Sequence, residues 1–173
     1  MSPLITRVAL AGARFVATAG LAVDAYVHFD LAGTYSETGG VISEGVLFRA
    51  EAVVALLAAL FILIIGKRAS YLAGLVIAGS ALAAMLVARY VDVGAIGPFP
   101  DVYDPVWFPE KVLAAIGEGA AMLAAIAGIA LLWKTRGRTA GPGEAAGQNG
   151  ERSADPGRSD WRERTKEREG RRS

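Results

Sequence analysis

Ionisable side chains inside long apolar stretches are the residues of this chain best placed to do chemistry. Charged groups inside a membrane are costly, so those found there bind ions or substrates, relay protons or pair with one another. In the outer half of these stretches they comprise three carboxylates, two arginines and the only histidine of the chain. These residues, the polar cluster, are Asp24, His28, Arg49, Glu51, Arg89 and Glu118.

The three carboxylates of the polar cluster are predicted to lie at one depth. Helical rise places Asp24, Glu51 and Glu118 roughly 8 to 10 Å below the outer ends of their helices, with both arginines nearer the surface. His28 follows Asp24 by four residues and therefore shares its helix face. Arg49 and Glu51 are about 200° apart around one helix, so they cannot face the same neighbour.

Two interpretations of the polar cluster stay open. In the first, the arginines and His28 pair with the carboxylates and form an ionic clasp that fixes the order of the helices. In the second, the acids outnumber the arginines, and the remaining negative charge forms a proton- or cation-responsive site that opens to the outside.

Four apolar segments must position these side chains, at 8–29, 45–65, 71–91 and 112–133. Each reaches the about 20 residues that a membrane helix needs. Hydrophobic residues make up 53% of the 173-residue chain, and the mean hydropathy is +0.38. The sequence therefore predicts an all-α membrane protein, with a four-transmembrane-helix bundle in residues 1–136.

The first segment carries an alternative interpretation. Arg14 and Asp24 both oppose its insertion, since each costs up to about 2.5–3.5 kcal/mol at a helix centre. Arg7 and Arg14 could instead precede a short apolar core at 15–23, followed by a small-residue cleavage site at 23–25. A cleaved signal peptide of this kind would leave three spans.

Charge asymmetry between the connections predicts the orientation. Cytoplasmic loops carry an excess of Lys and Arg. Acidic residues dominate the connections at 30–44 and 92–111, whereas basic residues flank the other helix ends. We therefore expect a multi-pass protein of the bacterial inner membrane with both termini in the cytoplasm. The basic residues are Arg7, Lys67, Arg68, Lys134, Arg136 and Arg138.

The acidic connection at 92–111 is rich in proline and aromatic residues, which predicts an ordered cap over the outer mouth of the bundle. Proline restricts the backbone, and aromatic rings suit the membrane interface. The segment could be an interfacial anchor, or a lid or docking surface. Its candidate residues are Phe99, Asp101, Tyr103, Asp104, Trp107 and Glu110.

The C-terminal segment 137–173 is predicted to be disordered. It is rich in Gly, Arg, Glu and Ser and has one large apolar side chain, Trp161. Its mixed charges suit a solubilising or weakly membrane-associating tail, and no nucleic-acid-binding module is recognisable. The expected partners are the lipid bilayer and either a second copy of the chain or another membrane protein. Small residues at four-residue spacing, as in Gly117, Ala121 and Ala125, favour such close helix packing.

Several classes of site have no signature here. The chain has no cysteine and one histidine, and it contains no phosphate-binding loop, dinucleotide fingerprint or zinc-protease motif. The sequence therefore predicts no cofactor, no metal site and no assigned catalytic residue.

Three segments resemble small four-span integral membrane proteins of actinobacteria, and the resemblance covers residues 8–133. It implies the topology but supplies no catalytic residues, since the family has no assigned activity. The segments are Tyr26-Val27-His28-Phe29-Asp30, Leu47-Phe48-Arg49-Ala50-Glu51-Ala52 and Asp104-Pro105-Val106-Trp107-Phe108-Pro109-Glu110-Lys111.

The leading functional hypothesis is an accessory or binding membrane protein whose outer acidic cluster recognises a cation, a proton change or a partner helix. A small transporter or channel subunit is the second. The third is a membrane enzyme acting on a lipid-soluble substrate, with Asp24, Glu51 or Glu118 as acid or base beside His28.

Overall fold

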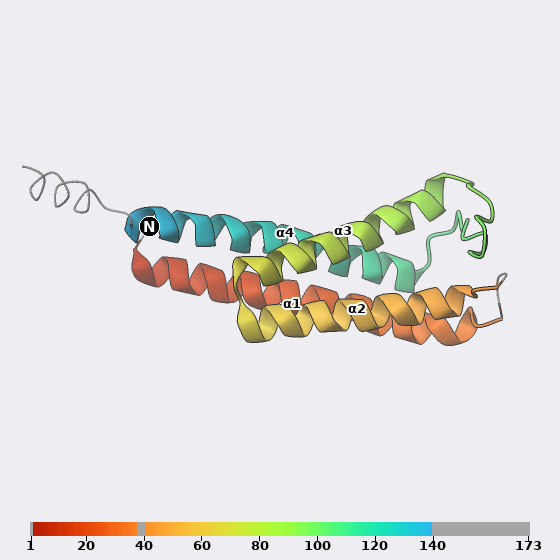
Figure 1. Cartoon of the computed structure of the whole chain (residues 1–173), viewed down its shortest axis with the longest axis horizontal. Coiled ribbons are helices and arrows are strands. Elements are labelled where there is room, and N and C mark those ends of the chain that lie inside the picture. The colour runs from red at the N-terminus through yellow and green to blue at the C-terminus, as the bar shows by residue number, and fades with distance from the viewer. Residues whose placement is uncertain (1, 38–40, 140–173) are drawn as a thin grey trace, which may run out of the picture. The chain divides into compact units, whose positions relative to one another are not determined.

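Four α-helices make up the regular structure in the computed structural model, which describes residues 2–37 and 41–139. Of residues 136–139 only the backbone is described. The helices are α1 (Pro3–Thr34), α2 (Glu44–Ile65), α3 (Arg68–Tyr90) and α4 (Pro109–Thr139). They alternate in direction and run side by side as a bundle, so α1 begins at the end where α4 finishes (Figure 1). The part of the predicted tail from residue 140 onward lies outside the described residues.

All four helices are long and apolar enough to cross a membrane. Their large apolar side chains point outward, as at Ile64 and Leu123, which are 70% and 72% exposed. The interior is built mostly from alanine, including Ala17, Ala55 and Ala125. Lipid tails solvate the outer side chains, while small interior residues let helices pack closely. The predicted all-α, four-span membrane architecture is confirmed.

Helix boundaries differ from the predicted spans at several ends, and a capping residue explains the early start of α1. α2 begins one residue before the predicted span and ends with it, at Ile65. α1 starts at Pro3 instead of residue 8 because the Ser2 hydroxyl accepts a hydrogen bond from the backbone N–H of Ile5. Proline at the first helical position suits this start. α1 is then continuous through residues 23–25 to Thr34.

Arg14, one of the two charges that weaken the first span, caps the neighbouring helix. Its Nε donates to the carbonyl oxygen of Ile62 at 3.0 Å, and its Nη2 donates to that of Leu63. These carbonyls belong to the last turn of α2, which has no intrahelical donors left. The guanidinium thus meets the negative end of a helix, which favours a cation.

α1 and α4 touch backbone to backbone at a pair of glycines. A Cβ on Gly117 would lie 2.8 Å from the carbonyl oxygen of Gly20, and a Cβ on Gly20 would overlap the carbonyl oxygen of Gly117. Only residues without a side chain fit at such a crossing. Asp24 follows Gly20 by one helical turn and Glu118 follows Gly117 directly, so the contact brings the two acids together.

Replacing Gly20 by alanine should push α1 and α4 apart and lower the stability of the bundle. Overpacking of this kind costs about 1–3 kcal/mol. Gly12→Ala is the matched control, because a Cβ at Gly12 in the same helix meets nothing within 4 Å. It should stabilise the helix by about 0.5–1 kcal/mol. Thermal unfolding of both variants in detergent would test this, and equal effects of the two would contradict the close contact.

Candidate functional site

The polar cluster has a core of three side chains from two helices. Asp24 of α1 and Glu118 of α4 are both 0% exposed, and the side chain of His28 is 14% exposed. One oxygen of each carboxylate and one ring nitrogen of His28 all lie within 4.8 Å of one another. His28 Nδ1 is 2.8 Å from Asp24 Oδ1 and 3.1 Å from the backbone oxygen of Asp24. These three residues are called the triad.

With both carboxyls ionised, the triad would carry more negative charge than its contacts neutralise. Asp24 Oδ1 has His28 as an ion-pair partner, but Asp24 Oδ2 and both oxygens of Glu118 have no hydrogen-bond partner in the described ranges. An unpaired buried carboxylate costs several kcal/mol. The triad therefore needs a further positive charge, from a proton or a cation, to be stable in this environment.

Glu51 of α2 lies beside the triad but faces a different space. Its charge acts on Asp24 and His28, and its Oε1 is buried without a hydrogen-bond partner in the described part of the chain. Glu51 and His28 line the same pocket, whereas Asp24 and Glu118 do not line it. The three carboxylates that were expected at one depth therefore fall into two groups. Asp24 and Glu118 belong to the triad, and Glu51 lies next to it.

The two arginines of the polar cluster are not brought to the carboxylates. Arg49 is exposed, and among the described residues it forms no ion pair. Arg89 places its guanidinium over the ring of Tyr90 at 5.0 Å and near that of Trp107 at 5.9 Å. The position of each arginine explains why it does not reach the carboxylates. Arg49 is about 200° from Glu51 around α2, so the two side chains point in different directions. Arg89 lies in the last turn of α3. Of the ion pairs that the first interpretation, the ionic clasp, requires, only the contact between His28 and Asp24 is present in the described residues.

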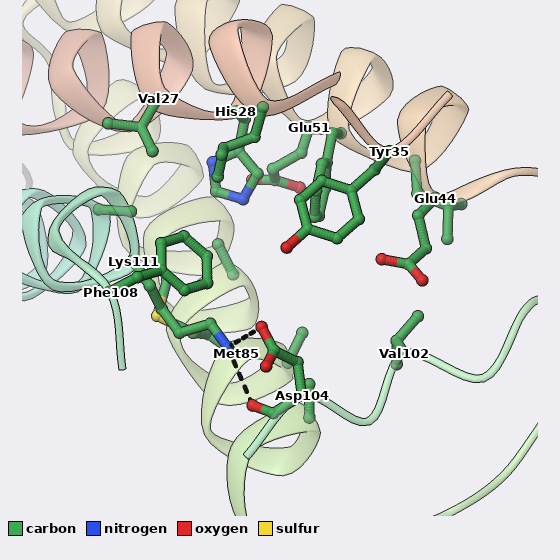
Figure 2. A pocket seen from close by; sticks show the side chains of 17 residues that line it. Val27, His28, Tyr35, Glu44, Glu51, Met85, Val102, Asp104, Phe108 and Lys111 are labelled. Carbon is green, nitrogen blue, oxygen red and sulfur yellow. Dashed lines mark hydrogen bonds and ion pairs between the residues drawn. The ribbon is translucent and has the colours of Figure 1, made fainter. Parts of the chain in front are cut away.

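A pocket of about 300 Å³ opens beside the triad, between the helices and the connection that precedes α4 (Figure 2). Aliphatic side chains such as Val27, Leu47 and Met85 form much of its wall. The rings of Tyr35 and His28 both meet Phe48 edge to face, at 5.2 and 5.5 Å between centroids. Its ionisable lining residues are His28, Tyr35, Glu44, Glu51, Asp104 and Lys111.

The Tyr35 hydroxyl points into the pocket (Figure 2). Burial of the phenol raises its pKa, and the nearby acids Asp104 and Glu44 raise it further. Both causes disfavour the phenolate. Tyr35 therefore stays neutral at physiological pH.

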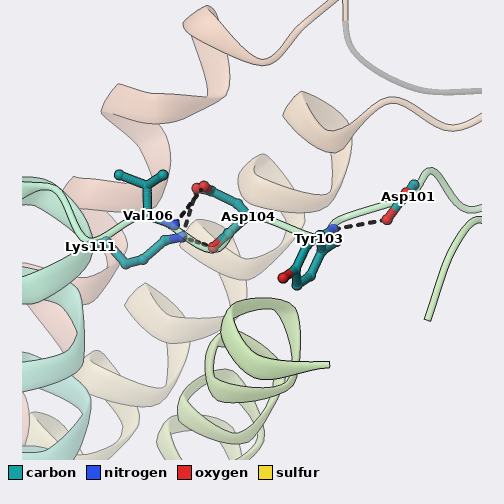
Figure 3. A network of polar contacts seen from close by, with 5 residues as sticks. All are labelled: Asp101, Tyr103, Asp104, Val106 and Lys111. Atoms are coloured by element: carbon teal, nitrogen blue, oxygen red, sulfur yellow. Dashed lines mark hydrogen bonds and ion pairs between the residues drawn. The ribbon is translucent and has the colours of Figure 1, made fainter. Parts of the chain in front are cut away.

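Lys111, the only basic lining residue apart from His28, is held by the connection between α3 and α4 (Figure 3). Its Nζ lies 2.6 Å from Asp104 Oδ2 and donates to the Asp104 backbone oxygen at 3.0 Å. The same carboxylate accepts from the backbone N–H of Val106, and Asp101 accepts from that of Tyr103. The predicted cap segment is thus a series of turns fixed by aspartates, and Lys111 is already paired.

The candidate cap residues divide by their position. Asp104 lines the pocket, whereas Asp101 and Glu110 are exposed. The rings of Phe99, Tyr103 and Trp107 are 46%, 39% and 39% exposed. This mixture fits both predicted uses of the segment, since its aromatic rings face outward while one carboxylate reaches the pocket.

Several pocket residues were not singled out from the sequence. Phe48 precedes Glu51 by three residues on α2, and such spacing places two side chains on one helix face. Lys111 could be recognised in the sequence as the single basic residue of the two acidic connections, 30–44 and 92–111. Tyr35 and Met85 had no comparable signal, because their place in the pocket depends on contacts between helices.

No protein-family model, curated protein or solved structure matches this chain. The resemblance to small four-span proteins of actinobacteria therefore stays a prediction, and the function must be argued from the pocket and the triad.

Proposed function

We propose that this chain is a binding protein of the bacterial inner membrane whose pocket takes a small organic cation. The observation that carries the proposal is that two acids of the pocket have no positively charged partner in the described residues. Lys111 is paired with Asp104, and His28 with Asp24. Glu44 and Glu51 have no ion-pair partner in the described residues, and Glu51 has a buried oxygen without a hydrogen bond. A cation would neutralise the charge that these two acids carry when they are ionised.

The walls of the pocket favour an organic cation over an inorganic one. Aliphatic side chains and the rings of Tyr35, Phe48 and Phe108 would meet the apolar body of a ligand. Aromatic faces also attract ammonium groups. The volume of about 300 Å³ is at the small end of ligand sites. An amine or quaternary ammonium with one short apolar substituent fits this chemistry.

Benzyltrimethylammonium should bind to the full chain in nanodiscs more strongly than neopentylbenzene, its neutral isostere. Equilibrium dialysis with protein-containing nanodiscs and, in parallel, with empty nanodiscs separates binding to the protein from partition of the ligand into lipid. Glu51→Gln should weaken binding of the cation by about tenfold or more, because it removes the Coulomb attraction between the carboxylate and the quaternary ammonium. Glu110→Gln, at an exposed acid, is the control. Equal binding of cation and isostere, or an unchanged affinity in Glu51→Gln, would contradict the proposal.

The orientation that we propose places the pocket on the outer side of the membrane and both termini in the cytoplasm. Arg7, Lys67 and Arg68 lie near helix ends on one side of the bundle, and the acidic connections lie at the other end. The positive-inside rule supports this assignment. The resemblance to actinobacterial four-span proteins supports a bacterial membrane.

Single cysteines can test this orientation because the chain has none of its own. Glu37 and Lys67 are exposed and lie in connections at opposite ends of the bundle. A membrane-impermeant maleimide should label Glu37→Cys in spheroplasts and label Lys67→Cys only after lysis. The reverse pattern would show that the pocket faces the cytoplasm.

A further inference from the structure

We propose that the triad of Asp24, His28 and Glu118 binds a divalent first-row transition-metal ion. This site is separate from the organic-cation pocket. Asp24 and Glu118 do not line that pocket, and only His28 belongs to both. The inference does not rest on the proposed function.

The spacing of the donor atoms fits a metal ion. Metal–oxygen and metal–nitrogen bonds of about 2.0–2.2 Å put two ligand atoms about 3–4.4 Å apart, depending on geometry. The three donors of the triad already lie within 4.8 Å of one another. Small rotations of the side chains would complete the coordination, without any movement of α1 against α4.

Burial and charge give an independent reason for a cation here. Asp24 and Glu118 are both 0% exposed, and neither oxygen of Glu118 has a hydrogen-bond partner in the ranges described. Solvent and salt screen exposed acids, but they do not reach these two, so a bound cation or a proton must balance the charge. A divalent ion would balance both carboxylates and satisfy their free oxygens.

The donor set indicates the class of ion. Imidazole nitrogen suits Zn²⁺, Fe²⁺ and similar ions, whereas Mg²⁺ and Ca²⁺ take oxygen donors. One imidazole with two carboxylates therefore favours Zn²⁺, Mn²⁺, Fe²⁺ or Co²⁺ over the alkaline-earth ions. Three protein ligands leave at least one coordination position for water. A shared proton is the competing occupant, and the measurements below distinguish it.

The first experiment uses the full chain in detergent, with any affinity tag removed and metals stripped by a chelator. Dialysis against Zn²⁺, Mn²⁺ or Co²⁺ and elemental analysis should give one ion per chain, while Mg²⁺ should be retained at least tenfold more weakly. Pulsed electron paramagnetic resonance on the Mn²⁺ form should detect one coordinated imidazole nitrogen. The chain has a single histidine, so that signal identifies His28.

Variants test the two carboxylates. Asp24→Asn and Glu118→Gln keep the shape of each side chain and should weaken metal binding more than about tenfold. Asp30→Asn and Glu110→Gln are matched controls, because they remove exposed acids from the same two helices. Both controls should bind metal like the parent chain. Benzyltrimethylammonium binding should survive in Glu118→Gln, which separates this site from the pocket.

Two results would overturn the metal site. One is that none of the three ions binds stoichiometrically to the folded parent chain. A shared proton would then be the counter-charge. The other is bound metal with no imidazole nitrogen in its spectrum, or with affinity unchanged in both Asp24→Asn and Glu118→Gln. The spectrum of the parent chain decides the question even if a variant fails to fold.

Discussion

The contact between Gly20 and Gly117 is the constraint on which the polar interior depends. It allows the backbones of α1 and α4 to touch, and each glycine stands next to, or one turn from, a buried acid. With any larger residue at the crossing, the helices would separate and the carboxylates of Asp24 and Glu118 would lie farther apart. Close packing by small residues, a general device of membrane helices, is thus what concentrates negative charge here.

Three arginines elsewhere in the bundle contact carbonyl oxygens or aromatic rings. Arg14 donates to carbonyl oxygens at the end of α2, and Arg68 donates to the Leu132 carbonyl while lying 4.9 Å from the centroid of the Trp133 ring. Arg89, in the last turn of α3, lies over the rings of Tyr90 and Trp107. These three guanidinium groups therefore have partners that are not carboxylates. In the described part of the chain, no arginine forms an ion pair with the buried acids of the triad or with Glu51.

Much of this architecture could be predicted from the sequence, because long apolar runs and loop charges are direct consequences of the bilayer. The common depth of Asp24 and Glu118 followed from counting residues along a helix. Rotation about the helix axes and the pairing of helices could not be obtained this way. One of the two interpretations paired Arg49 and Arg89 with acids that they do not meet in the described residues. Tyr35 and Met85 were missed as lining residues. Gly20 also escaped notice, because the residues four positions before and after it, Val16 and Asp24, are not small.

Cross-linking between positions 24 and 118 would test most directly whether α1 and α4 bring two buried acids into one site. The chain has no cysteine, so a double variant, Asp24→Cys with Glu118→Cys, offers a single pair of thiols. A short bifunctional thiol reagent applied to native membranes should link this pair efficiently. It should link a pair at Asp30 and Glu118 poorly, because Asp30 is exposed on the outer face of α1. Equal cross-linking of both pairs, or none at 24 and 118, would contradict the shared site.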